Sequence, residues 1–273
     1  RVLFRSVVIL DASAFYPEGG GQAGDTGVLG GVRVLDTRER GEDIVHLCAG
    51  PLTPGSQVSG RIDWEPRFRR MQQHSGEHIV SGMLCAAYNC DNTGFHMGSD
   101  VVTIDYNAEI PWEGVLDIER RANRYIWENH PIHIWYPSPE ELAVLPYRSK
   151  KALEGAVRIT AFPGADMCAC CGTHVETSGQ VGLAKFIGWQ RFRDGVRLEV
   201  LFGQRALDYL ALGHVHAAAL SAAGDVSYGY CGCPEGRGFD ELGDKGFLTG
   251  QVERGHAELR FVPFARRRYC IVQ

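Results

Sequence analysis

The sequence contains no apolar run near the roughly 20 residues that a membrane-spanning helix needs. Its first 15 residues are broken by charged side chains and do not fit a secretory signal peptide. The cysteine count of nine is odd, so complete pairing into disulfides would leave one thiol over. These absences predict free thiols in a reducing compartment, which we expect to be the cytoplasm, and no membrane partner.

An excess of positive charge is also lacking. Lys and Arg number 28 against 33 Asp and Glu, which gives a net charge of −5. A nucleic-acid partner would therefore be held by local basic clusters, such as Arg67, Arg69 and Arg70. With 44% hydrophobic and 22% charged residues in 273, the composition is that of a globular protein of about two domains.

Two common phosphate-binding patterns are missing from the glycine-rich segment 11–27. It has neither the G-x-G-x-x-G spacing of a dinucleotide fold nor the lysine of a P-loop. Its glycines allow positive φ and close approach of the backbone to a ligand, so the segment is either a set of tight turns or a cradle of N–H groups. Three polar side chains that a simple turn does not require, Gln22, Asp25 and Thr26, favour the cradle.

Short β-strands are predicted around this loop. Apolar and β-branched residues, bounded by glycine and proline, occur at 7–10, 32–35, 44–48 and 58–62. We expect them to form a small, barrel-like N-terminal β domain over residues 1–65.

A long helix is predicted over 67–88. Asp63 suits the N-cap, where its carboxylate would accept from free backbone N–H groups, and Pro66 suits the first turn. The helix carries His74 and His78, and side chains four residues apart lie on one helix face. This pair either binds a single ion or is satisfied by neighbouring side chains.

A second group of potential ligands lies at 166–174, which has the sequence DMCACCGTH. Zinc in proteins commonly takes four Cys and His ligands, supplied as close pairs from separate elements. We therefore predict a Zn²⁺ site, with Cys168 and Cys171 as competing thiols. The predicted zinc ligands are His74, His78, Cys170 and His174.

The rest of the chain alternates between strand and helix patterns. Further strands are predicted at 100–106, 132–136, 156–161, 179–190 and 195–202. The other predicted elements are a loop at 89–98, an amphipathic helix at 115–127, a helix begun by a capping box at 138–141, and an alanine-rich helix at 204–223. The fold class expected is α+β, with helices packed on an antiparallel sheet in a second domain over 66–210. Residues 211–273 are expected to begin as helix and to continue as a tail without an assigned role.

Several motifs in order along the chain resemble the editing domain of the alanyl-tRNA synthetase family, in particular its freestanding AlaX-type trans-editing members. The motifs are Phe15–Gly27 (FYPEGGGQAGDTG), Asp63-Trp64, His74–His78 (HSGEH) and Cys170–Val175 (CCGTHV). The resemblance covers about residues 7–210, and so short a chain has no room for an aminoacylation module, which favours the freestanding form. Glu77 departs from the family, whose members usually have a non-acidic residue there.

The resemblance implies a hydrolase acting on the ester that joins a wrong amino acid to tRNA(Ala), with serine as the main substrate and glycine as a second candidate. It also implies that Zn²⁺ is held by the four ligands named above, and that Thr26 or Asp25 reads the serine hydroxyl. The pocket for the aminoacylated adenosine would be lined by Gly19, Gly20, Gly21 and Gln22. Catalytic contributions are expected from Gly21, Gln22, Asp25 and Thr26.

Two other functions fit parts of the sequence. The segment HSGEH also matches the H-x-x-E-H pattern of a zinc peptidase, in which Glu77 would be the general base. Alternatively, the metal is purely structural and the chain is an RNA-binding module. A peptidase would not need the Cys-x-x-x-His pair or the glycine loop, and the net negative charge disfavours the RNA-binding module, so we expect the editing hydrolase.

Overall fold

The structure is a computed structural model, and it describes most of the chain. The described residues are 6–98, 101–149, 155–207, 209–212, 218–223, 226–232, 244–253 and 256–264. The chain separates into two compact units, Arg1–Gly203 and Gln204–Gln273. Among the described residues, no helix is both long and apolar enough to cross a membrane.

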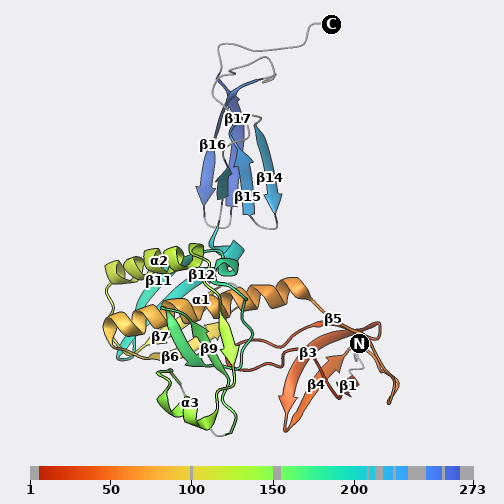
Figure 1. Cartoon of the computed structure of the whole chain (residues 1–273). Helices are drawn as coiled ribbons and strands as arrows, with labels where there is room; N and C mark the ends of the chain where they lie inside the picture. The colour runs from red at the N-terminus through yellow and green to blue at the C-terminus, as the bar shows by residue number, and fades with distance from the viewer. Residues whose placement is uncertain are drawn as a thin grey trace. The chain divides into compact units, whose positions relative to one another are not determined.

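The first unit begins with an antiparallel sheet of five strands in the order β1-β4-β3-β2-β5 (Figure 1). The strands are β1 (Ser6–Ile9), β2 (Gly27–Leu29), β3 (Val32–Arg40), β4 (Asp43–Cys48) and β5 (Gly60–Ile62). β1, β3, β4 and β5 confirm the strands predicted from the apolar runs in this region, whereas β2 was not predicted. The sheet is open, because β1 and β5 are its two edge strands, so the barrel-like closure we expected is not confirmed. A small core of Phe15, Leu29, Val34 and Cys48 stabilises the sheet.

Helix α1 (Trp64–Tyr88) follows this sheet and is the central element of the first unit. Every residue from 73 to 82 is buried, so the middle of the helix is enclosed on all sides rather than on one face. Pro66 lies in the first turn as predicted. The capping prediction for Asp63 is wrong: it occupies the N-cap position, but its side chain makes no cap hydrogen bond.

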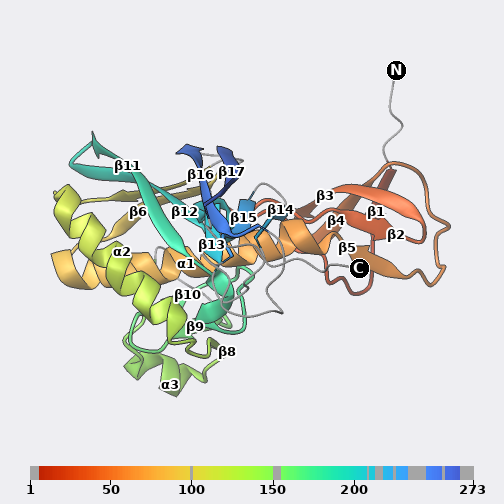
Figure 2. The ribbon, with the colours of Figure 1, turned by 90° about the horizontal axis from the view of Figure 1, so that it is seen from above.

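The remainder of the first unit contains two further sheets and two helices, of which α2 packs against α1 and α3 lies away from it (Figure 2). One antiparallel sheet has the order β11-β12-β7-β6 and the other has the order β10-β9-β8. The elements are β6 (Asn92–Met97), β7 (Val102–Tyr106), α2 (Trp112–Trp127), β8 (His133–Trp135), α3 (Pro139–Val144), β9 (Ile159–Phe162), β10 (Asp166–Ala169), η1 (Ser178–Val181), β11 (Ala184–Phe192) and β12 (Gly195–Phe202). Helices on antiparallel sheets confirm the α+β class. The capping box that begins α3 is also confirmed, since Ser138 and Glu141 make both of its hydrogen bonds.

One predicted loop in this unit is a strand. We expected residues 89–98 to be irregular because they are rich in Asn, Asp and Gly, but β6 occupies 92–97 and pairs with β7. β6 lies at the edge of its sheet, where only one side needs a partner, so the local sequence carries little of the strand pattern.

The second unit is built from strands. It contains η2 (Gly203–Ala206) at its start, then β13 (Tyr209–Leu212), β14 (Ala219–Ala223), β15 (Val226–Tyr230), β16 (Gly246–Glu253) and β17 (His256–Pro263). The helix predicted over 204–223 is therefore wrong: β13 and β14 both pair with β15. Alanine favours a helix over other ordinary residues by less than about 0.7 kcal/mol each, and strand pairing outweighs so small a preference.

Two glycines let α1 approach its neighbours closely. A Cβ atom at Gly76 would lie 2.3 Å from Cδ1 of Phe202, and one at Gly82 would lie 2.2 Å from the backbone oxygen of Ala165. Real Cβ atoms do not come so close to other heavy atoms, so a residue other than glycine would require the neighbouring atoms to shift. Gly82 therefore holds the helix against the turn that leads into β10.

We predict that Gly82→Ala lowers the free energy of unfolding by about 1–3 kcal/mol, as expected for overpacking. The added methyl group meets a backbone oxygen, which cannot move aside as a flexible side chain would. Urea unfolding of the two proteins measures the change. The matched control is Ala86→Gly at an exposed position of the same helix, which reports helix propensity alone, about 1 kcal/mol. If Gly82→Ala instead stabilised the protein by that amount, the close approach would be refuted.

Candidate metal centre

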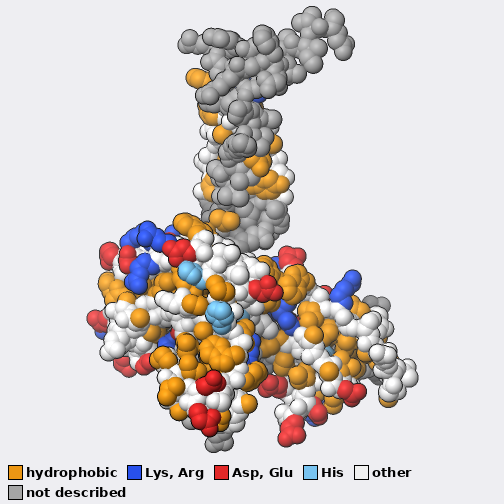
Figure 3. Space-filling model, viewed as in Figure 1, with side chains coloured by type: hydrophobic (Ala, Val, Ile, Leu, Met, Phe, Trp, Pro, Cys, Tyr) orange, Lys and Arg blue, Asp and Glu red, His pale blue; other side chains and the backbone are white. Residues whose placement is uncertain are grey.

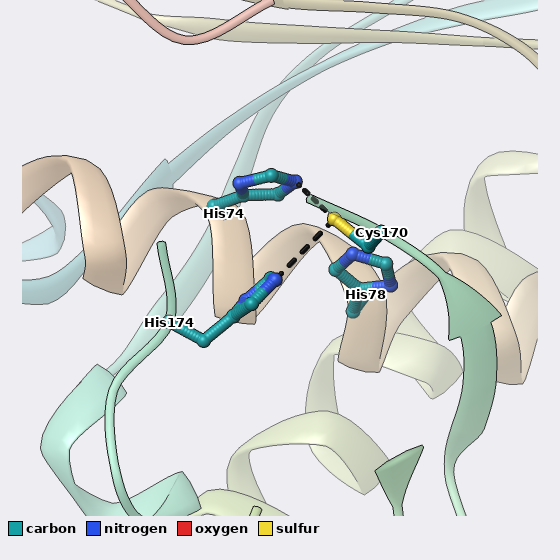
Figure 4. Close-up of side chains that lie close together, drawn as sticks. All are labelled: His74, His78, Cys170 and His174. Atoms are coloured by element: carbon teal, nitrogen blue, oxygen red, sulfur yellow. Dashed lines mark hydrogen bonds between the residues drawn. The ribbon is translucent and has the colours of Figure 1, made fainter. Parts of the chain in front are cut away.

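Four side chains from two distant segments converge inside the first unit. His74 and His78 come from α1, and Cys170 and His174 come from the segment after β10 (Figure 4). Their candidate ligand atoms all lie within 4.8 Å of one another. Cys170 Sγ lies 3.4 Å from Nε2 of His74 and 3.4 Å from Nε2 of His174. The structure therefore brings together the four residues predicted as ligands.

The helical spacing and one glycine explain this convergence. The imidazoles of His74 and His78 stack with ring centroids 5.2 Å apart, as expected one helical turn apart. A Cβ atom at Gly172 would lie 2.0 Å from Cε1 of His74, so only glycine allows the Cys170–His174 segment to pass so close to α1.

The competing thiols have other positions. Cys171 is exposed, whereas Cys168 is buried in β10. Cys168 also belongs to a second group of candidate ligand atoms within 4.8 Å of one another, with His78 and Asp166. Of the three neighbouring cysteines, Cys170 alone belongs to the group that contains all three histidines.

Each imidazole is fixed through its Nδ1 atom by a group outside the cluster. The partners are Gln22 Oε1 for His74 at 3.3 Å, Asp166 Oδ2 for His78 at 2.8 Å, and Ser75 Oγ for His174 at 3.2 Å. A ring that donates its Nδ1–H to such an acceptor leaves the Nε2 lone pair free for a metal ion. His78 Nε2 is buried and has no hydrogen-bond partner among the described residues, which fits an atom that needs an ion.

The electrostatics of the cluster favour metal binding. Burial alone would raise the pKa of the Cys170 thiol, but the interactions with the three imidazoles, led by hydrogen bonds from His174 and His74, together outweigh burial and hold the pKa far below its usual value. Burial lowers the pKa of His174 to about 3, with further lowering by the neighbouring imidazoles. A thiolate beside neutral imidazoles is the protonation state that a metal ion requires of its ligands. One sulfur and three nitrogen donors suit a transition-metal ion.

His78 is the exception among the histidines. Burial by itself would lower its pKa, but the interactions with Asp166, Cys170 and Glu77 together outweigh burial, and the pKa lies well above the usual value. The carboxylate of Asp166 is itself kept ionised, because hydrogen bonds from His78 and Arg148 lower its pKa against the effect of burial.

Part of the glycine-rich loop lies at the cluster. Gly19 and Gln22 exchange two backbone hydrogen bonds of 3.0 Å, and Gly20 and Gly21 between them have positive φ. Gln22 is buried, and its Nε2 donates to Thr173 Oγ1 at 2.8 Å. The loop predicted to line a pocket therefore meets the segment that carries the cysteine and the third histidine.

Asp25 and Thr26 lie farther along the loop and have other partners. Asp25 is completely buried and accepts from Arg67 Nε at 2.8 Å and from the backbone N–H of Tyr16 at 2.7 Å. Thr26 Oγ1 donates to Asp63 Oδ2 at 2.5 Å. The structure thus uses the Asp25 carboxylate to join the loop to α1.

Glu77 takes no part in the cluster. Its Oε1 atom accepts hydrogen bonds from Ser81 Oγ at 2.7 Å and from Asn92 Nδ2, and Ser81 is in turn 2.8 Å from the Tyr106 hydroxyl. These groups hold the carboxylate in a buried network between α1 and the sheet that contains β6 and β7. Its position is unsuited to the general base of a peptidase.

Four residues around the cluster are absent from the sites predicted from the sequence: Ser75, Thr173, Arg148 and Asp166. A usable signal existed for Asp166: alternate residues of a strand lie on one side, and Asp166 and Cys168 are two apart in β10. For Ser75, Thr173 and Arg148 the sequence carries no such signal, because their roles depend on contacts between distant segments.

Comparison with known proteins gives two family matches. Residues 4–66 match the family described as tRNA synthetases class II (A), and residues 157–198 match the threonyl and alanyl tRNA synthetase second additional domain. The second match contains Cys170 and His174. The first contains the glycine-rich loop.

The chain is also similar to several curated proteins. It is 34% identical over 213 residues to the alanyl-tRNA editing protein AlaX-L of Pyrococcus horikoshii, which covers 74% of this chain and 53% of the relative. It is 34% identical over 209 residues to the alanyl-tRNA editing protein Aarsd1-B of Xenopus laevis, covering 75% and 51%. It is 35% identical over 224 residues to the alanine–tRNA ligase of Thermofilum pendens, covering 77% and 25%. The chain thus spans about half the length of the editing proteins that it matches.

We predict that Cys170→Ala weakens metal binding by more than about 100-fold, since loss of a ligand should exceed the 10–100-fold effect of losing an outer partner. Cys171→Ala, one residue away and exposed, is the matched control and should bind the metal as the wild type does. Titration with Zn²⁺ in competition with a chromogenic chelator measures both affinities. Equal losses in the two variants would contradict the assignment of Cys170.

Proposed function

We propose, from the similarity of this chain to the alanyl-tRNA editing proteins, that it is a hydrolase which removes a wrong amino acid from tRNA(Ala). The main substrate would be seryl-tRNA(Ala), with glycyl-tRNA(Ala) as a second candidate. The observation that carries the proposal is the contact between Gln22 of the glycine-rich loop and His74 of the cluster. That contact joins the glycine-rich motif at residues 15–27 to the histidine motif at residues 74–78.

The metal ion in this proposal is Zn²⁺. Imidazole and thiolate groups are common protein ligands of Zn²⁺, and the Nε2 atom of His78, which has no hydrogen-bond partner among the described residues, is suited to bind it. A bound Zn²⁺ would supply Lewis acidity, which acts directly on an ester carbonyl or a water molecule only if the ion gains a fifth ligand position.

Four protein ligands fill a tetrahedron, so the chain's own polar groups must orient the substrate. The backbone N–H groups of Gly20 and Gly21 are suited to this, because no hydrogen bond from either is found to any described residue. Their positive φ angles lie in the turn that Gln22 closes, next to the cluster. A single well-placed donor to a developing oxyanion is worth about 3–4 kcal/mol in catalysis.

The nucleic-acid partner would be bound through local contacts. Acidic and basic side chains are mixed on the face in Figure 3, and several arginines are paired, as Arg120 is with Asp117 and Arg69 is with Glu65. A net charge of −5 adds no overall attraction to RNA.

We also propose a division of labour along the chain. Residues 1–65 would present the glycine-rich loop, and residues 66–210 would form the zinc-binding catalytic region. Residues 211–273 have no proposed role. The seven described cysteines are free, which supports a reducing location such as the cytoplasm.

The test of the function is hydrolysis of seryl-tRNA(Ala) by the purified chain. We expect rapid release of serine by the wild type, loss of activity in His74→Ala, and nearly unchanged activity in Glu77→Gln. The last variant keeps an oxygen to accept from Ser81 and Asn92, so the buried network survives. A peptidase that used Glu77 as its base would show the opposite: peptide cleavage that Glu77→Gln abolishes. Failure of the wild type to release serine would refute the editing proposal.

Discrimination against correctly charged tRNA should come from the serine hydroxyl. A site that hydrogen-bonds a substrate hydroxyl strongly rejects an analogue that lacks it, and alanine lacks it. Thr26 is the expected reader, but its hydroxyl donates to Asp63, the N-cap residue of α1, which lies eleven residues before His74 and therefore about 16 Å along the helix from the cluster.

We predict that Thr26→Val affects hydrolysis of seryl-tRNA(Ala) and glycyl-tRNA(Ala) alike, because the Thr26 hydroxyl lies too far from the cluster to contact the substrate serine. The comparison variant is Thr173→Val, because the Thr173 side chain accepts from Gln22 beside His74. Initial rates on the two substrates give the comparison. A loss about 10-fold larger on seryl-tRNA(Ala) in Thr26→Val, the effect of one lost hydrogen bond, would assign the reading of serine to Thr26.

A further inference from the structure

The three imidazoles of the cluster are supported unequally. His74 and His174 are held by neutral groups, the amide oxygen of Gln22 at 3.3 Å and the hydroxyl of Ser75 at 3.2 Å. His78 is held by the carboxylate of Asp166 at 2.8 Å. Hydrogen bonds to an ionised acceptor are shorter and stronger than neutral ones, and the distances follow that order.

Arg148 keeps the Asp166 carboxylate in place. Its guanidinium makes two parallel hydrogen bonds, from Nε to Oδ1 at 2.8 Å and from Nη2 to Oδ2 at 2.7 Å. The Asp166 side chain is only 2% exposed, so a cation beside it is needed to offset the cost of burying its charge. The Oδ2 atom is thus shared between Arg148 and His78.

The contacts of Asp166 show whether it is itself a metal ligand or a group that supports the ligand His78. Asp166, His78 and Cys168 lie close enough to form a metal site of their own. Both carboxylate oxygens of Asp166 are already bonded, however, and the Cys168 thiol faces the backbone oxygen of Ala169 at 3.5 Å. Asp166 therefore acts on the metal centre through His78 rather than as a ligand.

We propose that Asp166, held by Arg148, is a positioning residue that makes His78 the strongest nitrogen donor of the metal centre. This inference rests on the metal site of the proposed function. A carboxylate behind an imidazole fixes the ring and raises the basicity of its free nitrogen. His74 and His174, with neutral partners, are the weaker donors. The ion is accordingly anchored by His78 and Cys170.

The test compares the Zn²⁺ affinity of the wild type with that of Asp166→Asn and Ser75→Ala, each measured on the full chain against a chromogenic chelator. Asp166→Asn keeps the size of the side chain and one oxygen to accept from His78, but it removes the charge and replaces the oxygen that accepts from Arg148 Nε by an NH2 group. We expect it to weaken Zn²⁺ binding by 10–100-fold, the usual effect of an outer partner. Ser75→Ala removes a neutral partner altogether and should weaken binding less. Unchanged affinity in Asp166→Asn, or a loss in Ser75→Ala at least as large, would overturn the proposal.

A spectroscopic readout separates positioning from damage to the fold. The visible absorption bands of the Co²⁺-loaded proteins report the ligand set and its geometry. We expect Asp166→Asn to keep the wild-type bands once saturated, because its four ligands are unchanged and only the affinity has fallen. Altered bands at saturation would mean that the ligand set itself was disrupted, which contradicts a positioning role.

A second variant covers the case in which Asp166→Asn does not fold. Arg148→Lys keeps the positive charge beside Asp166 but loses the paired geometry, so it should weaken Zn²⁺ binding by a smaller factor. Unchanged affinity in Arg148→Lys would then overturn the proposal. Serine release by the wild type is measured separately. If the wild type releases no serine, the editing function is refuted, but the order of Zn²⁺ affinities among the wild type and its variants is unaffected.

Discussion

The structure depends on hydrogen-bonding and metal-binding partners for the polar side chains in the buried middle of α1. Every residue of α1 from 73 to 82 is buried, and the stretch includes His74, Ser75, Glu77 and His78. An unpaired buried polar group costs about 1–3 kcal/mol, so each of these side chains requires a specific neighbour. Ser81 and Asn92 supply that neighbour for Glu77, and Asp166 supplies it for one side of His78. Among the described residues, no side chain or backbone group supplies a hydrogen-bond partner for Nε2 of His78, which suits an ion. The same burial that would penalise an empty site therefore makes a metal centre stabilising.

Close packing sets the distances on which this centre depends. Gly76, Gly82 and Gly172 each stand where a Cβ atom would overlap a neighbouring atom. Gly82 brings α1 against the turn before β10, which places Asp166 beside His78. Gly172 lets the Cys170–His174 segment pass over the His74 ring. Glycine at these positions serves close approach. In the glycine-rich loop, Gly20 and Gly21 instead serve the turn through their positive φ angles.

The parts of the structure that sequence could predict are those governed by local pattern. The helical spacing of His74 and His78 and the short strands of the first sheet follow from side-chain periodicity, and the structure has them. The choice of Cys170 among three neighbouring cysteines was less secure, because spacing alone does not tell which thiol faces the histidines. Errors arose where distant pairing decides the outcome: β6 was expected to be loop, and β13 and β14 were expected to be helix. The sequence also predicts a helix-capping side chain at Asp63, but its carboxylate instead accepts hydrogen bonds from Arg33 and Thr26.

The contacts of the glycine-rich loop argue against treating the N-terminal sheet as an independent binding module. The loop is joined to α1 by the Asp25–Arg67 ion pair and to the cysteine segment by the Gln22–Thr173 hydrogen bond. The second of these links spans 151 residues of sequence. A boundary near residue 65 therefore cuts through the candidate site, with the loop on one side and the metal ligands on the other. The sheet acts as a scaffold that holds Gly20, Gly21 and Gln22 at the cluster, and neither region by itself contains the whole site.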